Sequence, residues 1–182
     1  MATLDATPFS DTGAIAVTVG YATSNHLRTL ADLRKVAANM TLGAPPQFQQ
    51  STPGLSLLEQ DYGFVPATFK ALVIGSQYQA LDGGIVQAAE VATTDGQLLS
   101  GRYRLLRDPD RVFGWGQVIP IVPKRVLIAE GPAFAGTINR INRLLTLAAI
   151  RELNAAVDIY NKDPAAVAKQ FLQAHGLLRP TA

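Results

Sequence analysis

Short apolar runs alternate with segments of helical periodicity along the first two thirds of the chain. The runs that predict β-strands are 14–19, 40–43, 69–74, 86–92, 103–106 and 118–122. Between them, Thr29 with Asp32 three residues later resembles a capping box that opens a helix reaching Asn39, and Pro53 and Gly63 mark the ends of another. A shorter helix is predicted between Ser76 and Gly83. Strands that alternate with helices in this way indicate an α/β unit.

After Pro123 the pattern becomes helical throughout. Apolar residues stand at helical spacing over 132–145, and they are Phe134, Ile138, Ile141 and Leu145. A second helix is predicted to start at Thr146, and a third at Pro164 with Asp163 as its N-cap and Gly176 as its stop. A helical tail behind an α/β unit predicts two lobes.

Composition narrows the class of protein. The 182 residues are 48% apolar and 16% charged, so the chain is able to bury a substantial core. The net charge of +2 comes from scattered basic residues, which argues against a nucleic-acid partner. No apolar run of membrane-spanning length occurs, and the residues from Met1 to Asp5 lack the pattern of a signal peptide, so any export signal or lipid anchor is expected outside this chain.

No group of residues predicts a reaction centre. The absence of cysteine excludes disulfides and zinc-thiolate sites and says nothing about the compartment. His26 is predicted to lie in a loop and His175 at a helix end, and neither has the neighbours of a metal site or catalytic triad. The segment 107–111, with its paired acids around a proline, predicts a solvated loop. We therefore expect no metal, no cofactor and no enzymatic activity.

Motifs in a consistent order over nearly the whole chain resemble the substrate-binding domain of glycine betaine and choline ABC transporters. The most distinctive is Gly-Ala-Pro-Pro-Gln-Phe at 43–48. The others lie at 8–17, 29–33, 62–63, 79–81, 93–96 (Thr-Thr-Asp-Gly), Phe113 with Pro120, 152–154 (Glu-Leu-Asn) and 163–177.

The resemblance implies an α/β fold of the type 2 periplasmic-binding-protein kind, in which two lobes enclose a ligand. By that comparison residues 1–117 form the second lobe, with a mixed sheet flanked by helices. Residues 118–182 would supply the return hinge strand and the C-terminal helices of the first lobe. The N-terminal half of the first lobe has no counterpart here, so the helices are expected to pack on a second copy, as a homodimer, or back on the second lobe.

The ligand chemistry of the family is incomplete in this sequence. A trimethylammonium group is held by aromatic faces, each contributing about 0.5–2 kcal/mol. Three cage tyrosines of the family are replaced by Gly13, Ala92 and Gly116, and Ser51 replaces an arginine. The candidate ligand-binding residues are Asp11, Thr12, Gly13, Gln50, Ser51, Thr93, Trp115, Gly116 and Gln117. Trp115, the only tryptophan, is either an aromatic face of this site or a packing residue of the hinge.

The function implied is that of a solute-binding component of an ABC importer. It would capture glycine betaine, choline or a divergent small solute in the cleft and deliver it to the membrane permease, outside the cytoplasmic membrane, either in the periplasm or lipid-anchored at the cell surface. An effector-sensing domain of a regulator with the same fold stays open as an alternative, and an enzyme is the less favoured one.

Overall fold

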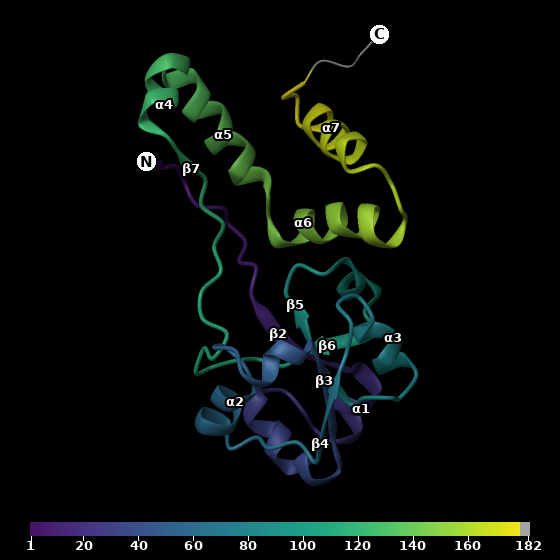
Figure 1. Cartoon of the computed structure of the whole chain (residues 1–182). Helices are drawn as coiled ribbons and strands as arrows, with labels where there is room; N and C mark the ends of the chain where they lie inside the picture. Colours follow the sequence, from purple (N-terminus) through teal and green to yellow (C-terminus); the bar gives the residue numbers. More distant parts are fainter. Residues whose placement is uncertain (179–182) are drawn as a thin grey trace. The chain divides into compact units, whose positions relative to one another are not determined.

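The computed structural model describes residues 1–178 (Figure 1). Chain contacts divide it into two compact units, each formed from separate stretches of sequence. We call Thr12–Thr93 with Ser100–Trp115 the sheet unit, and Met1–Asp11 with Thr94–Leu99 and the residues from Gly116 onward the helical unit. The chain therefore changes unit at four points in the sequence.

The sheet unit is built on five strands in the order β4-β3-β5-β2-β6. Their bounds are β2 Gly13–Thr18, β3 Thr41–Ala44, β4 Thr68–Ala71, β5 Ala88–Ala92 and β6 Tyr103–Leu105. Strand β3 runs parallel to β4 and β5, whereas β2 runs antiparallel to β5 and β6. The predicted α/β class with a mixed sheet is confirmed.

The register brings several strand ends to one edge of this sheet. Gly13, which begins β2, pairs with Ala92, which ends β5. Ala44 and Ala71, which end β3 and β4, pair with each other. Strand β6 also ends toward this edge, because the Leu106 N–H donates to the carbonyl of Ile15. Ligands of open α/β sheets bind outside the carboxyl ends of strands, which makes this edge the first place to look for a site.

Helices and 3₁₀ turns cover the sheet. They are α1 Val19–Ser24, α2 Leu55–Tyr62, α3 Gln77–Asp82 and the 3₁₀ segments η1 Leu30–Lys35, η2 Ala37–Asn39 and η3 Pro46–Gln49. The capping box at Thr29 and Asp32 is confirmed, although it opens two short 3₁₀ segments instead of one α-helix to Asn39. Helix α2 begins at Leu55, two residues after the predicted start, and it ends as predicted at Gly63 with φ 61°.

The core of the sheet unit lies between the sheet and these helices. Ile15, Val17 and Leu42 from the strands are fully buried, as are Leu58 and Phe64 from α2 and the turn after it. Phe48 from η3 is also buried. Alternation along the strands and the 3.6-residue period of the helices thus produce one contiguous apolar cluster.

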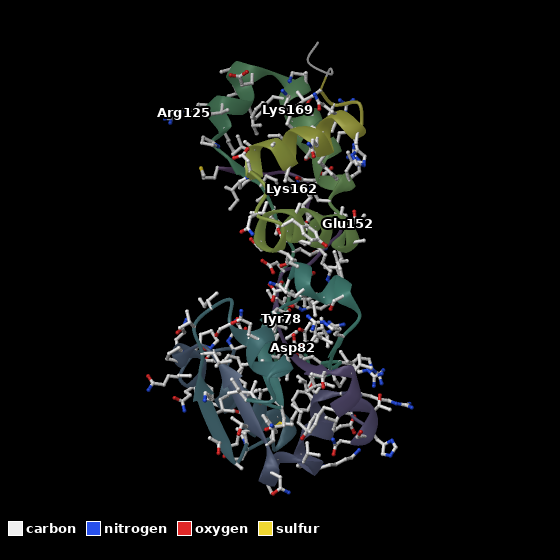
Figure 2. The ribbon with its side chains drawn as sticks, turned by 90° about the vertical axis from the view of Figure 1, so that its right-hand side faces the viewer. Tyr78, Asp82, Arg125, Glu152, Lys162 and Lys169 are labelled. Carbon is white, nitrogen blue, oxygen red and sulfur yellow. The ribbon has the colours of Figure 1, made fainter. Side chains whose placement is uncertain are left out.

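Helix α3 is tied to strand β6 by a polar cluster around Asp82 (Figure 2). The Tyr103 hydroxyl donates to Asp82 Oδ1 at 2.8 Å, and Arg102 donates to Oδ2 at 2.8 Å. The Tyr78 ring meets the Tyr103 ring edge-on, with centroids 4.8 Å apart. Burial, followed by the hydrogen bond to Asp82, raises the pKa of Tyr103 to about 12. The phenol therefore stays protonated and acts as a structural donor.

The helical unit contains a two-stranded ribbon and four α-helices among the residues described. Strand β1 (Ala2–Thr3) pairs antiparallel with β7 (Ile121–Val122), and the helices are α4 Lys124–Glu130, α5 Pro132–Leu144, α6 Leu147–Asn154 and α7 Pro164–Ala174. A π-helical turn, Ala155–Ile159, extends α6. The predicted cap is present, because Asp163 accepts from the Ala166 N–H, and Thr146, where a helix was predicted to start, caps α6 by accepting from the Ala149 N–H.

Two sequence expectations need correction here. The strand predicted over 118–122 shrinks to two residues, because Pro120 and Pro123 have no N–H with which to extend a ladder. The carbonyls of Val118 and Pro120 still accept from the N-terminal segment, through Thr7 and Leu4. Helix α4 lies in the region predicted to be helical after Pro123, but it was not predicted as a separate element.

The Thr-Thr-Asp-Gly motif holds the middle of the helical unit together. The Thr94 hydroxyl donates to Asp11 Oδ1 at 2.7 Å, and the Thr94 carbonyl accepts from Asn154 at 2.9 Å. A Cβ at Gly96 would lie 2.5 Å from the backbone of Ala155, so only glycine allows this approach. None of the helices in the described part of the chain has the length and apolar character needed to span a membrane.

Candidate functional site

A pocket of about 210 Å³ opens at the edge where the strand ends meet, and every residue that lines it belongs to the sheet unit. The lining residues are Thr12, Gly13, Ala14, Thr93, Leu105, Leu106, Asp108, Arg111, Phe113 and Gly114. A volume of this size accommodates one small solute. The pocket is therefore our candidate ligand site.

Three of the predicted ligand-binding residues, Thr12, Gly13 and Thr93, lie in its wall. Thr12 and Thr93 exchange hydrogen bonds, since the Thr12 N–H donates to Thr93 Oγ1 at 3.1 Å and the Thr93 N–H donates to the Thr12 carbonyl at 2.9 Å. This exchange fixes the adjoining ends of β2 and β5, and with them one side of the pocket.

The predicted residues Asp11, Gly116 and Gln117 belong to the helical unit and are absent from the lining. The Asp11 N–H donates to the Gly116 carbonyl at 2.7 Å, and its carboxylate accepts from Thr94. Gln117 forms an isolated antiparallel bridge with Ser10. In this structure the three residues pair the two segments that run beside the ribbon.

Gln50 and Ser51 follow η3 and are also outside the lining. The Ser51 hydroxyl donates to the Pro53 carbonyl at 2.9 Å, which fits a turn before helix α2. A second pocket, of about 340 Å³, lies nearby at the ends of β3 and β4 and is lined by Pro45, Pro46, Gln47 and the apolar run 71–74.

Phe113 occupies the space in front of Gly13. A Cβ added to Gly13 would lie 2.7 Å from Cδ1 of Phe113, well inside van der Waals contact. Phe113 is buried and packs against Phe48, with ring centroids 6.3 Å apart. An aromatic ring therefore lines this wall, but it comes from the loop after β6 and not from position 13.

The loop after β6 is organised by a single carboxylate. Asp108 accepts hydrogen bonds from the Tyr62 hydroxyl at 2.6 Å and from the N–H groups of Val112 and Phe113 at 3.1 and 3.0 Å. The Tyr62 oxygen also accepts from the Asp110 N–H at 2.8 Å. Burial, with the bond to Asp108, raises the pKa of Tyr62 above its ordinary value. The prediction of a solvated loop was wrong for Asp108, because its oxygens are taken by donors of the protein.

Arg111 stands out in this loop. Its φ of 57° lies in the left-handed region, which few residues other than glycine, asparagine and aspartate adopt. Its guanidinium carbon lies 3.9 Å from the centroid of the Trp115 ring, in cation–π geometry. Trp115 is 75% exposed and is not among the lining residues, whereas Arg111 is.

Sequence reasoning missed Asp108 and Arg111 as pocket residues. The Asp-Pro-Asp turn signal was recognised, but turn chemistry alone does not tell which side of a loop faces a pocket. His26 and His175 lie apart, at an exposed turn and at the end of α7, and no group of three His, Asp or Glu side chains in residues 1–178 is arranged to hold a metal ion.

Comparisons with known proteins agree with the fold. Residues 1–174 match the family described as the substrate binding domain of ABC-type glycine betaine transport systems. A glycine-betaine-binding protein of Pseudomonas aeruginosa is 31% identical over 96% of this chain and 60% of its own length. A carnitine transport binding protein of Listeria monocytogenes is 25% identical over 93% of this chain and 55% of its own length.

A solved structure supports the same assignment. The crystal structure of a glycine betaine/carnitine/choline ABC transporter protein superposes with a TM-score of 0.84 at 28% identity, covering 97% of this chain and 64% of that one. The chain spans 60% of the length of the Pseudomonas relative. On this match of sequence and fold, the chain belongs to the family of substrate-binding domains of ABC-type glycine betaine transport systems.

Proposed function

We propose that this chain is the solute-binding component of an ABC importer and that the pocket beside Gly13 is where it contacts a small osmoprotectant. The observation that supports this most is that Thr12, Gly13 and Thr93, singled out by the family resemblance, line one pocket at the carboxyl edge of the sheet. The names of the relatives point to the same solutes, glycine betaine and carnitine.

The role requires binding and release only, not catalysis. Delivery to a membrane permease and a location outside the cytoplasmic membrane are parts of the same proposal, because both come from the family. Asp11, Gln50, Ser51, Gly116 and Gln117 stay predicted ligand contacts.

We further propose that the sheet unit corresponds to the second lobe of the family fold and that a second copy of the chain covers the helical unit. Helices α4 and α6 contain no buried residue, and the apolar positions of α5 are only half-buried. Helices that expose so much apolar surface are stabilised when another surface covers it and removes it from water.

A fluorescence titration tests the binding role. Trp115 is the only tryptophan and contacts Arg111, which lines the pocket, so its emission reports on ligand entry. We expect a saturable change with glycine betaine or carnitine. Choline and proline serve as comparison solutes. If none of the four solutes changes the emission while circular dichroism shows a folded protein, the proposal is overturned.

A further inference from the structure

We propose that Arg111 binds the carboxylate of the solute and that Trp115 serves as a platform for Arg111 instead of as a cage wall for a quaternary ammonium group. This inference rests on the proposed solute-binding function. It assigns a carboxylate-bearing ligand to the pocket and a specificity-determining role to a residue outside the predicted set.

The stacking geometry leaves the donors of Arg111 available. A guanidinium group stacks through its flat face, and its five N–H donors lie in its plane and point away from its edges. The guanidinium carbon of Arg111 lies 3.9 Å from the centroid of the Trp115 ring, and a guanidinium stacked at this distance keeps those edges accessible. A carboxylate matches them with two parallel hydrogen bonds. Stacking on Trp115 therefore orients Arg111 for this contact and leaves its N–H donors free to bind the carboxylate.

Among the residues described, Arg111 has no carboxylate partner. Arg111 takes part in none of the ion pairs described within residues 1–178, which include those of Lys35, Arg102 and Arg143. The nearest acid in the pocket wall, Asp108, already accepts three hydrogen bonds from the protein. The guanidinium of Arg111 is therefore available to pair with the carboxylate of a ligand.

The backbone at Arg111 is held in an uncommon conformation. Left-handed φ is unfavourable for a residue with a side chain, and such strain persists where the surroundings impose it. Here the Arg111 N–H donates to the Asp108 carbonyl, and the Arg111 carbonyl accepts from Gly114 at 2.8 Å. Because the turn is secured on both sides, Arg111 is presented to the pocket before any ligand arrives.

The same contact makes Trp115 a poor receptor for a second cation. The indole face that would attract a trimethylammonium group already carries the guanidinium. A cationic solute without a carboxylate gains nothing from Arg111 and is repelled by its charge. Choline, which has a hydroxymethyl group in place of the carboxylate of glycine betaine, should therefore bind weakly.

Calorimetric titration of the full chain with glycine betaine and with choline tests this. We expect the wild type to bind glycine betaine at least about tenfold more tightly than choline, the scale of a charge-assisted hydrogen-bond pair. Arg111→Asn should lose about tenfold or more for glycine betaine and little for choline. Asparagine tolerates left-handed φ, so the loop is retained.

Arg107→Asn is the matched control, since this exposed arginine of the same loop is not in the lining and its loss should leave both affinities unchanged. Equal affinities for the two solutes in the wild type, or an unchanged glycine betaine affinity in Arg111→Asn, would refute the assignment of Arg111 while leaving the binding role intact. If the folded wild type binds neither of these solutes, nor carnitine or proline, the proposed function itself is overturned, and the assignment with it.

Discussion

At the scale of single residues, the wall of the pocket depends on the missing side chain of Gly13. Phe113 lies where that side chain would start, so the two positions compete for one volume. The glycine at 13 and the buried ring at 113 are therefore complementary parts of one packing arrangement.

Gly13→Ala should therefore destabilise the protein. Its methyl group would lie 2.7 Å from Phe113 Cδ1 and 3.1 Å from Glu90 Oε1, and overpacking of this kind costs about 1–3 kcal/mol. Urea denaturation measures the change. Gly20→Ala in α1 is the control, because no atom lies within 4 Å of its added methyl group and it should be neutral or stabilising. Equal stabilities of the two variants would contradict the packing argument.

Tyr62→Phe tests the hydrogen-bond cluster around Asp108. Removing the hydroxyl takes away one of the three hydrogen bonds that Asp108 accepts and leaves the Asp110 N–H without its Tyr62 acceptor, so we expect a loss of about 1–2 kcal/mol at neutral pH. Tyr160→Phe, at a 68% exposed position, should change little.

The pH dependence of the same variant follows from the raised pKa of Tyr62. The neutral phenol is favoured in the folded state, so its stabilisation is complete below the unfolded pKa of about 10 and is lost as the pH rises through the higher folded value. Denaturation midpoints between neutral and alkaline pH should fall less steeply in Tyr62→Phe than in the wild type. Parallel slopes would count against the assignment.

At the scale of elements, the sequence predicted correctly those features whose hydrogen bonds join neighbouring residues. The caps at Thr29, Thr146 and Asp163 each join a side chain to a backbone N–H a few residues away, so sequence spacing suffices to find them. Strand β7 is shorter than predicted because Pro120 and Pro123 lack an N–H, and α2 starts two residues later than predicted, after a turn in which the Ser51 hydroxyl donates to the Pro53 carbonyl.

Asp32→Asn tests the capping box. Asp32 accepts from Lys35, from the N–H groups of Arg28 and Thr29 and from the Thr29 hydroxyl, and these contacts lower the pKa of its carboxyl. A depressed pKa stabilises the fold above the unfolded value near 4 and loses this effect as the pH falls through the folded one.

We therefore expect Asp32→Asn to cost about 1 kcal/mol at pH 7, with the difference from wild type shrinking under acid conditions. Thermal denaturation at a series of pH values measures this difference in stability. Asp61→Asn, on the exposed side of α2, is the control and should match the wild type throughout. A penalty independent of pH would show that the charge of Asp32 is not what stabilises the segment.

At the scale of the whole molecule, the two units differ in how much they bury. The largest fully buried side chains, among them Phe64, Ile15 and Leu58, all belong to the sheet unit. Buried side chains in the described helices of the other unit are few, and they are chiefly Asn142, Ala155 and Val167. We therefore expect a further surface to cover the helical unit.

Sedimentation velocity over a range of concentrations measures whether a second copy supplies that cover. We expect reversible self-association, weakened by Ile138→Gln on the apolar stripe of α5 and unaffected by Arg140→Gln on its exposed side. A monomer at every concentration, together with rapid amide exchange throughout these helices, would rule the proposal out.

The sequence by itself determined the α/β class, the helical tail, the main caps and the family, because periodicity, capping and motif order are properties of neighbouring residues. Only the tertiary structure decided the pocket. Thr12 meets Thr93, Phe113 fills the space at Gly13, and Arg111 stacks on Trp115 beside a loop held by Asp108 and Tyr62. Most of these contacts join residues far apart in the chain, and such pairs are set by strand register and close packing, which no local pattern encodes.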